Sequence, residues 1–259
     1  MLLCSKGIVI VPKLLRKKTA LLLLGLLAQS AFAESQLVTF PASLTCGTWL
    51  FQLGGFYAHQ GKSQNIGIVD LIGDRFTVTN QNDGNVLIGL GYTINGQTFN
   101  RVNLSYGLNA FYLPETMVKG KVIQEDTFTN LSYHYSVNNY PIYFVLKGLV
   151  STDNPGYNVT FDLGLGANII QTSRVKEKSL DNGITLPDHA FSGMAQTAFS
   201  ASVGVGIQFN NLFNHVPVEC GYRFFYLGQG GFHKQTDQLT NTLKTGQSYA
   251  NALMCAISV

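Results

Sequence analysis

The chain has 259 residues, of which only 12% are charged, with 27 glycines, 12 tyrosines, 17 phenylalanines and a formal net charge of +3. Soluble domains usually contain about a quarter charged residues, so the composition is unusually poor in charge. After residue 33 the sequence nevertheless lacks the run of about 20 apolar residues that a transmembrane helix requires. The composition therefore excludes a helical membrane protein and favours one that crosses the membrane with strands.

Residues 1–33 have the pattern of a cleaved export signal. A basic cluster precedes an apolar run, and Ala31-Phe32-Ala33 before Glu34 is a small-residue cleavage site. These residues hold five basic and no acidic side chains, so their removal leaves 12 Lys and Arg against 14 Asp and Glu, a net charge of −2. The basic balance thus belongs to the signal, and we expect no nucleic-acid partner. Residues 34–47 are interpreted as a periplasmic leader.

The rest of the chain, 48–259, shows repeated alternation of apolar residues with Gly, Ser, Thr, Asn or Gln. Period two indicates strands, and the small uncharged residues on the second face suit a narrow enclosed interior better than a water-exposed one. The predicted strands are Trp49–Tyr57, Val86–Ile94, Val102–Tyr112, Leu131–Leu146, Val159–Ile169, Phe199–Phe209, Val216–Tyr226 and Tyr249–Val259.

The second and third strands form the clearest hairpin. Asn95-Gly96 lies between them and is a strong turn signal. If Val102, Leu104 and Tyr106 are to face lipid, the loop must hold an odd number of residues. We therefore predict a bulged three-residue turn with a left-handed Gly96, which pairs Ile88 with Val102.

The fourth strand is interrupted by Asn138, Asn139 and Pro141. Treated as one strand with a bulge at Asn138-Asn139, it gives eight strands, an even number as in bacterial outer-membrane barrels. A ten-stranded alternative recruits residues 66–79. With eight strands the long polar connections (60–84, 113–128, 170–196 and 228–248) alternate with short turns, as they do between the cell exterior and the periplasm. We predict an all-β, eight-stranded antiparallel transmembrane up-and-down β-barrel.

The faces of these strands predict what fills the barrel. The outward face is almost wholly Val, Ile, Leu, Phe and Tyr, and an eight-stranded barrel is just wide enough for side chains to fill. We expect a hydrogen-bonded polar plug in which Arg223 pairs with Glu219 or Asp162, since buried charges must be paired; a narrow channel is the alternative. The predicted polar set is Asp162, Glu219, Arg223, Gln208, Asn103, Asn109 and Asn168, with Gln52 on the same face and Lys147 there if the bulge shifts its strand.

The chain resembles the small OmpA-like and opacity-protein-like outer-membrane barrels. The resemblance covers about 48–259 and rests on the signal pattern, the Trp49-to-Tyr57 opening strand with Gly54-Gly55, the Gly-Leu-Gly strands at 89–91 and 164–166, and Gly221-Tyr222-Arg223-Phe224-Phe225 near the end. It implies an outer-membrane location in a Gram-negative bacterium. It also implies contacts with outer-membrane lipid and lipopolysaccharide, handling by the outer-membrane assembly machinery, and surface or host ligands reached through the long loops.

Two short segments invite an enzymatic interpretation. His134-Tyr135-Ser136 is similar to the His-x-Ser of outer-membrane lipid A deacylases, and residues two apart on a strand share a face. However, the Asn-Ala-Gly that follows in that family is absent, and alternation points both side chains inward. Asp188-His189 is similar to the acidic and histidine pairs of omptin proteases, but we interpret it as a solvated loop pair. No cofactor motif and no metal-ligand spacing is present, so we expect neither.

Of the cysteines after residue 33, Cys220 and Cys255 lie on adjacent predicted strands and both point outward. A contact between them is compatible with the pattern, but two reduced residues facing lipid are favoured. Cys46 in the leader is the candidate free thiol. The sequence favours a non-enzymatic, structural or surface-interaction protein with four polar loops.

Overall fold

The computed structural model describes residues 47–213 and 216–259. The signal segment, the leader to Cys46, and His215 lie outside the described residues. No helix among the described residues has the length and apolarity needed to cross a membrane.

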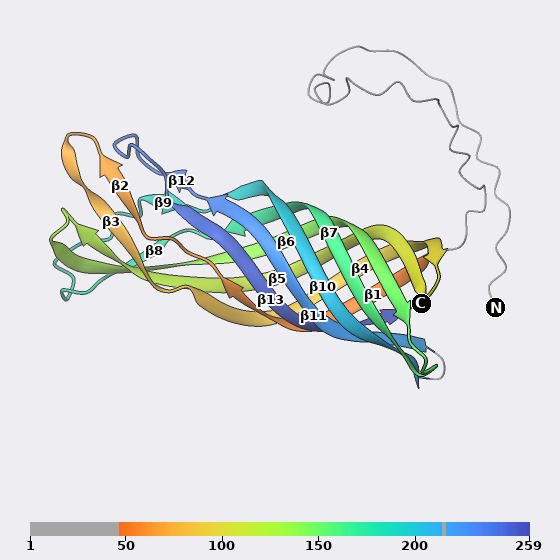
Figure 1. The fold of residues 1–259 in the computed structure, drawn as a ribbon. Coiled ribbons are helices and arrows are strands. Elements are labelled where there is room, and N and C mark those ends of the chain that lie inside the picture. Colours follow the sequence, from red (N-terminus) through yellow and green to blue (C-terminus); the bar gives the residue numbers. More distant parts are fainter. Residues whose placement is uncertain (1–46, 214–215) are drawn as a thin grey trace, which may run out of the picture. The chain divides into compact units, whose positions relative to one another are not determined.

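Eight long antiparallel strands close into a ring (Figure 1), and the prediction of an eight-stranded barrel is confirmed. Each strand pairs with its two neighbours, and β13 pairs with β1 to close the ring. In ring order the strands are β1 (Thr48–His59), β4 (Asn82–Phe99), β5 (Val102–Gln124), β6 (Phe128–Ser151), β7 (Tyr157–Thr172), β10 (Ala195–Phe213), β11 (Val216–Gly231) and β13 (Lys244–Ser258).

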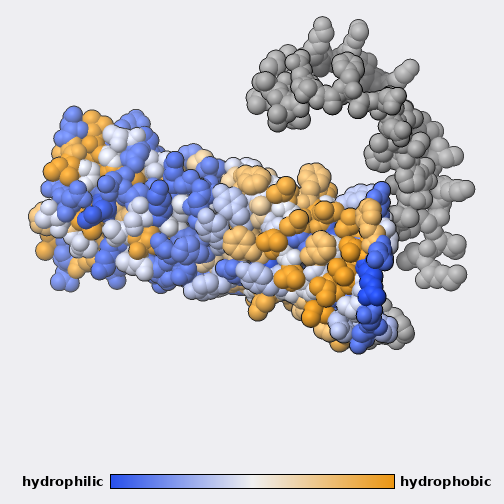
Figure 2. Space-filling view, viewed as in Figure 1, coloured by the Kyte–Doolittle hydropathy of each residue, from blue (hydrophilic) through white to orange (hydrophobic). Residues whose placement is uncertain are grey.

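The outer surface carries a belt of exposed apolar side chains on the half of the barrel nearer the short turns (Figure 2). Phe144 on β6 is 75% exposed and Leu253 on β13 is 71% exposed. Their neighbours in sequence, Tyr143 and Ala252, point inward and are buried. A continuous apolar exterior on a closed barrel is the surface that lipid covers, because a closed ring leaves no backbone hydrogen bond unpaired.

Aromatic pairs mark both borders of this belt. Trp49 and Tyr92 lie with ring centroids 5.0 Å apart near the short-turn end. Tyr112 and Tyr140 stack at 5.0 Å at the opposite border. Such girdles lie at the two membrane–water interfaces of transmembrane barrels, so the two pairs delimit the membrane-spanning segment.

Beyond the Tyr112–Tyr140 pair the strands continue past the membrane-spanning segment into a second structure. We call it the head (residues 60–81, 113–137, 172–194 and 230–245). It contains β2 (Gln64–Ile68), β3 (Leu71–Asn80), β8 (Lys176–Ser179), β9 (Phe191–Ser192) and β12 (His233–Lys234). The hairpin of β2 and β3 adds to β5, and β8 adds to β6. Residues 66–79 therefore form strands outside the ring, and the ten-strand alternative is wrong.

The expected loop at 113–128 is also strand. A register shift in β5 between Leu113 and Thr116 adds one residue to β5 relative to β6. Asn109, Phe111 and Leu113 point inward before this bulge, whereas the inward residues after it are Thr116, Val118 and Val122. Pro114 and Glu115 occupy the bulge, so the alternation of inward and outward residues changes phase there. For this reason the sequence pattern does not show that the strand continues beyond Leu113.

The bulge expected at Asn138-Asn139 of β6 is wrong. β6 pairs without interruption with β7 from Val137 to Ser151. Inward residues therefore stay in phase through the strand, and Tyr133, Tyr135 and Val137 are buried rather than facing outward. The extra residue lies on β5 instead, between Leu113 and Thr116. It changes which β5 residues point inward beyond that point, and leaves the facing of β6 unchanged.

The turn expected at Asn95-Gly96 is wrong as well. β4 continues to Phe99, and the chain reverses at Asn100-Arg101, where Asn100 has a φ of 54°. Ile88 consequently pairs with Tyr112 instead of Val102. A register shift between Asn95 and Thr98 keeps the lipid-facing assignment of Tyr106 and Leu108, both 50% exposed.

The head has a hydrophobic core of its own. The largest buried side chains in it include Tyr133, Tyr135 and Phe191. Hydrogen bonds join its distant segments: Asn241 Nδ2 donates to Asn65 O (2.8 Å), and Gly67 N donates to Asn241 Oδ1 (2.8 Å). The segment around Asn241 thereby covers the free edge of β2, which limits pairing with other chains.

Candidate functional site

Two ion pairs cross the lumen inside the apolar belt. Arg223 Nη2 lies 2.7 Å from Asp162 Oδ2, with side chains only 8% and 4% exposed. Nearer the short turns, Lys147 pairs with Glu219, whose other oxygen accepts a hydrogen bond from Thr160 Oγ1 (2.8 Å). The two buried and two partly buried charges are thus neutralised in pairs within the lumen, as burial in a low-dielectric space requires.

An aromatic layer lies next to these ion pairs, on the side nearer the head. The ring centroid of Phe111 lies 5.2 Å from that of Phe225 and 6.2 Å from that of Tyr143. The guanidinium carbon of Arg223 lies 5.1 Å from the Phe111 centroid, a cation–π geometry. Tyr143 Oη and Ser200 Oγ are 2.7 Å apart. Charged and aromatic layers therefore stack along the barrel axis.

The space left among the polar lumen residues is small. A cavity of about 20 Å³ is bordered by Gln52, Asn109, Asp162 and Arg223, among others. A cavity of this size has room for about one water molecule. The lumen at this level is filled by side chains, as the width of an eight-stranded barrel allows.

The remaining residues of the predicted polar set occupy different levels. Asn168 is buried and donates from Nδ2 to Asn139 Oδ1 (2.8 Å) and to Leu227 O (2.8 Å). Asn109 is 2% exposed and borders the small cavity. Gln208, half-buried, donates to Asn210 Oδ1 (3.2 Å) near the short-turn end. Asn103 shares the inward face but is exposed at that end, so it lies outside the buried network.

His134 and Ser136 lie in the head end of β6, on the face opposite the buried tyrosines. The expectation that they point inward is therefore wrong. Ser136 Oγ donates to Glu115 Oε1, so the carboxylate contacts the hydroxyl itself. Nowhere in residues 47–213 and 216–259 does a hydrogen bond join the His134 ring to Ser136 or Glu115. A hydrolytic triad needs the histidine between acid and nucleophile, and this arrangement lacks it.

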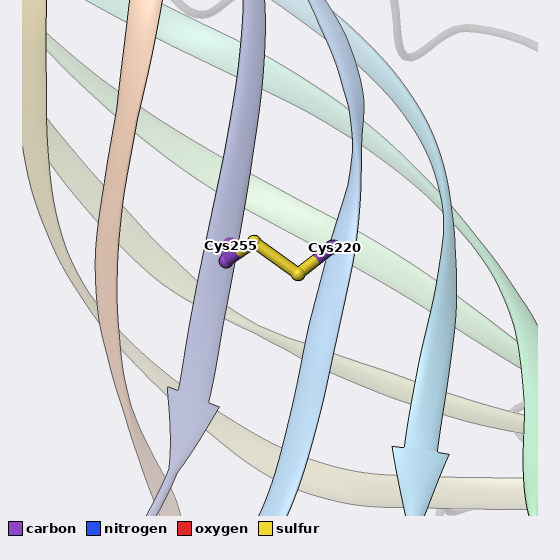
Figure 3. The surroundings of a disulfide bond; sticks show 2 residues. All are labelled: Cys220 and Cys255. Atoms are coloured by element: carbon purple, nitrogen blue, oxygen red, sulfur yellow. A yellow bond between two sulfur atoms is a disulfide. The ribbon is translucent and has the colours of Figure 1, made fainter. Parts of the chain in front are cut away.

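Cys220 and Cys255 form a disulfide on the outer face of the barrel (Figure 3). The two residues are directly opposed in the pairing of β11 with β13, and their Cα atoms are 4.1 Å apart. The expectation of two reduced residues is wrong, because the strands place them without the stagger that would separate them.

Three carboxylates in the head were not recognised from the sequence as a group. Asp74 on β3, Glu177 on β8 and Asp188 border one cavity. Glu177 Oε2 accepts the backbone N–H groups of Asp188 (2.9 Å) and His189 (3.1 Å). Burial raises the pKa of Asp74 and of Glu177, and the Asp188 carboxylate raises both further. The pairing of β3 with β5, of β5 with β6 and of β6 with β8 brings these distant residues together, and no spacing in the sequence indicates it.

The closed eight-stranded ring, its apolar belt and its aromatic girdles define a transmembrane β-barrel of the outer-membrane type. This is the fold that the resemblance to small outer-membrane barrels implies. No protein-family model matches the chain, and no curated protein matches it.

Solved structures of small barrels are similar to it. The outer membrane protein OprG from Pseudomonas aeruginosa is 14% identical with a TM-score of 0.48, covering 83% of this chain and 96% of OprG. Neisserial surface protein A is 12% identical (TM-score 0.37), covering 82% of this chain and 96% of that one. Ail of Yersinia pestis is 11% identical (TM-score 0.33), covering 83% and 100%. At these values the likenesses carry no inference about activity or ligands.

Proposed function

We propose that the protein is an integral outer-membrane protein of a Gram-negative bacterium with a structural or surface-interaction role. The observation that carries this proposal is the contrast between the filled lumen and the folded head. Ion pairs and aromatic rings occupy the lumen, whereas the head has its own core and holds its segments by hydrogen bonds. A filled barrel serves as an anchor, and an ordered head serves as a presented surface.

In this proposal the short turns face the periplasm and the head faces the cell exterior. The belt contacts outer-membrane lipid, and the head contacts lipopolysaccharide at its base. A chain of this class reaches its place through the outer-membrane assembly machinery. Long outer connections and short periplasmic turns are the arrangement of such barrels.

The surface of the head supports contact with a partner. Ile184 is 83% exposed and Leu186 is 74% exposed on the segment between β8 and β9. Leu71 and Ile72 at the β2–β3 hairpin are 67% and 63% exposed. Large apolar side chains on a surface beyond the lipid belt indicate an interaction site. A surface or host macromolecule reached through these connections is the partner proposed.

Display of the protein on a non-adherent bacterial host tests this role. Adhesion to an epithelial cell monolayer is measured for the wild type and for the double variant Ile184→Ser, Leu186→Ser. Loss of two anchoring side chains lowers adhesion by about tenfold or more. Lys178→Ser, an exposed substitution on the adjacent β8, is the matched control and leaves adhesion unchanged. Equal adhesion of wild type and empty host contradicts the proposal.

A narrow channel and a lipid A hydrolase are the competing functions. Conductance of the purified barrel in a planar bilayer tests the channel: the filled lumen predicts no steady current, and stable unitary steps would favour a pore. Mass analysis of lipid A from cells expressing the wild type or Ser136→Ala tests the hydrolase. Identical acylation in both supports a non-enzymatic role.

A further inference from the structure

A cavity of about 400 Å³ lies inside the head. Its walls come from three connections that are far apart in the sequence: the β2–β3 hairpin, the segment from β8 to β9, and residues 235–239 before β13. The β5–β6 hairpin completes the wall. Its volume falls within the range of pockets that hold small organic ligands.

The charge of this cavity is one-sided. Asp74, Glu177 and Asp188 line it, and none of its lining residues is a lysine, arginine or histidine. None of the three carboxylates takes part in the ion pairs found among the described residues. The neighbouring Lys234 directs its ammonium to the carbonyl oxygen of Leu239 at 2.8 Å. The three carboxylates face the same partly desolvated space and repel each other; His189, next to Asp188 in the chain, is a basic residue whose charge acts on Glu177.

The rest of the wall is apolar and aromatic except for Gln235, Thr236 and Gln238. Ile66, Phe76 and Phe191 are 1%, 3% and 0% exposed. The Phe76 and Phe191 rings meet edge to face with centroids 5.7 Å apart. Aromatic faces attract cations as well as apolar groups. The wall therefore offers burial for a carbon body beside attraction for a positive charge.

A bare metal ion fits this cavity poorly. No group of three His, Cys, Asp or Glu side chains in the part of the chain that the structure describes has the proximity needed to hold one. The carboxylates surround a space wide enough for a molecule instead of converging on a point. An organic cation satisfies both the spacing of the charges and the apolar wall.

We propose that this cavity binds a small organic cation with an apolar body, of the arylalkylammonium class. The ammonium group lies among Asp74, Glu177 and Asp188, and the carbon body packs against Ile68, Leu71 and Phe76 on the apolar part of the wall. Leu71, one of the exposed apolar side chains assigned above to surface contact, borders this cavity, whereas Ile184 and Leu186 do not line it.

The full barrel folded in lipid nanodiscs and titrated calorimetrically tests the proposal with four probes. The 2-phenylethylammonium ion is the expected ligand, and it binds with one-to-one stoichiometry. The neutral 2-phenylethanol binds at least about tenfold more weakly, because it lacks the charge that the carboxylates attract. The anion 3-phenylpropionate does not bind. Magnesium ion alone does not bind and does not displace the ammonium probe.

Charge-removing variants locate the site. Asp74→Asn and Glu177→Gln each weaken binding of 2-phenylethylammonium by about tenfold, and glutamine retains an oxygen that accepts the Asp188 and His189 N–H groups. Asp70→Asn is the matched control, because Asp70 is on the same hairpin, is exposed, and has a φ of 61° that asparagine tolerates. It leaves the affinity unchanged.

Several outcomes overturn the proposal. Equal affinity for the charged and the neutral probe does so, as does equal weakening by Asp70→Asn and Asp74→Asn. Competition by magnesium would assign the site to a metal instead. If a variant fails to fold, as judged by its heat-modifiable migration on detergent gels, the comparison of the four probes on the wild type still decides.

Discussion

Cys220 lies directly opposite Cys255 across β11 and β13, and the disulfide between them faces outward within the apolar belt. The bond closes a chain segment with a sequence separation of 35. It therefore links the last two strands covalently, and β13 pairs on its other edge with β1 to complete the ring. The register of the closing hairpin is held covalently as well as by hydrogen bonds.

Removing this disulfide is expected to destabilise the barrel. In the chain-entropy description a closed loop of this length contributes roughly 3–4 kcal/mol, so Cys220→Ala with Cys255→Ala lowers the urea midpoint in lipid vesicles. The fluorescence of Trp49, the single tryptophan, reports the transition. Wild type reduced before folding is the control and matches the double variant; midpoints unchanged from the oxidised wild type contradict the expectation.

The Arg223–Asp162 pair is expected to be costly to break from one side. Asp162→Asn leaves a buried guanidinium without its counter-charge and destabilises the barrel by about 3–5 kcal/mol. Replacing both residues, with Arg223→Met and Asp162→Leu, costs less, because no uncompensated charge stays in the lumen. The same urea titration measures both. A double variant that is less stable than Asp162→Asn would show that the pair contributes more than mutual neutralisation.

The head is expected to gain stability as pH falls from neutral. The pKa values of Asp74 and Glu177 are raised above their ordinary 3.8 and 4.5 by burial and by Asp188. The folded state then binds protons more tightly than the unfolded state, so the penalty of these charges is full at neutral pH and is relieved as pH falls through the raised values. Hydrogen exchange of head amides, corrected for intrinsic rates, shows more protection at pH 5 than at pH 7.

The double variant Asp74→Asn, Glu177→Gln is the control for this pH effect. It keeps the shape of the cavity wall and removes the two titrating groups. Protection of its head amides changes little between the same two pH values. A wild-type head that loses protection on acidification would contradict the assignment of raised pKa values to these carboxylates.

Deleting Pro114 is expected to leave the head folded. The deletion removes the extra residue of the bulge, so β5 pairs with β6 in regular alternation and Val118 and Val122 still point into the head core. Protease added to intact cells then leaves the head uncleaved. Inserting one alanine between Thr116 and Met117 is the comparison; it turns Val118 and Val122 to the surface, and the head becomes sensitive to protease. A cleaved head in the Pro114 deletion would mean that the bulge itself is needed for the head to fold.

The parts of the fold that follow strict alternation were predictable from the sequence. The lipid-facing side of Leu53, Val203 and Val205 was predictable because each of their neighbours in sequence is small or polar. The strand count and the outward faces of the belt are confirmed for this reason. Tyr133 and Tyr135 were assigned to the wrong face, because the apolar face of the unbulged β6 is the inward one in the head and the outward one in the belt.

The site was predictable only in part. Arg223 demanded a partner, and the sequence named two candidates, of which the structure selects Asp162. The turn expected at Asn95-Gly96 is wrong because β4 continues to pair with β5 as far as Phe99, although Asn-Gly is a common turn sequence. The carboxylates of the head come from segments more than a hundred residues apart, so their proximity is a property of tertiary packing.

β5 and β6 pass without a break from the short-turn end to the tip of the head, over 23 and 24 residues. At about 3.4 Å per residue each spans roughly 80 Å, and their mutual pairing extends along nearly the whole length. A pull on the tip acts along these strands, so it loads many inter-strand hydrogen bonds in shear at once instead of opening them one by one. In the orientation proposed above, the hairpin is a stiff connection through which a force on the head reaches the membrane-spanning segment.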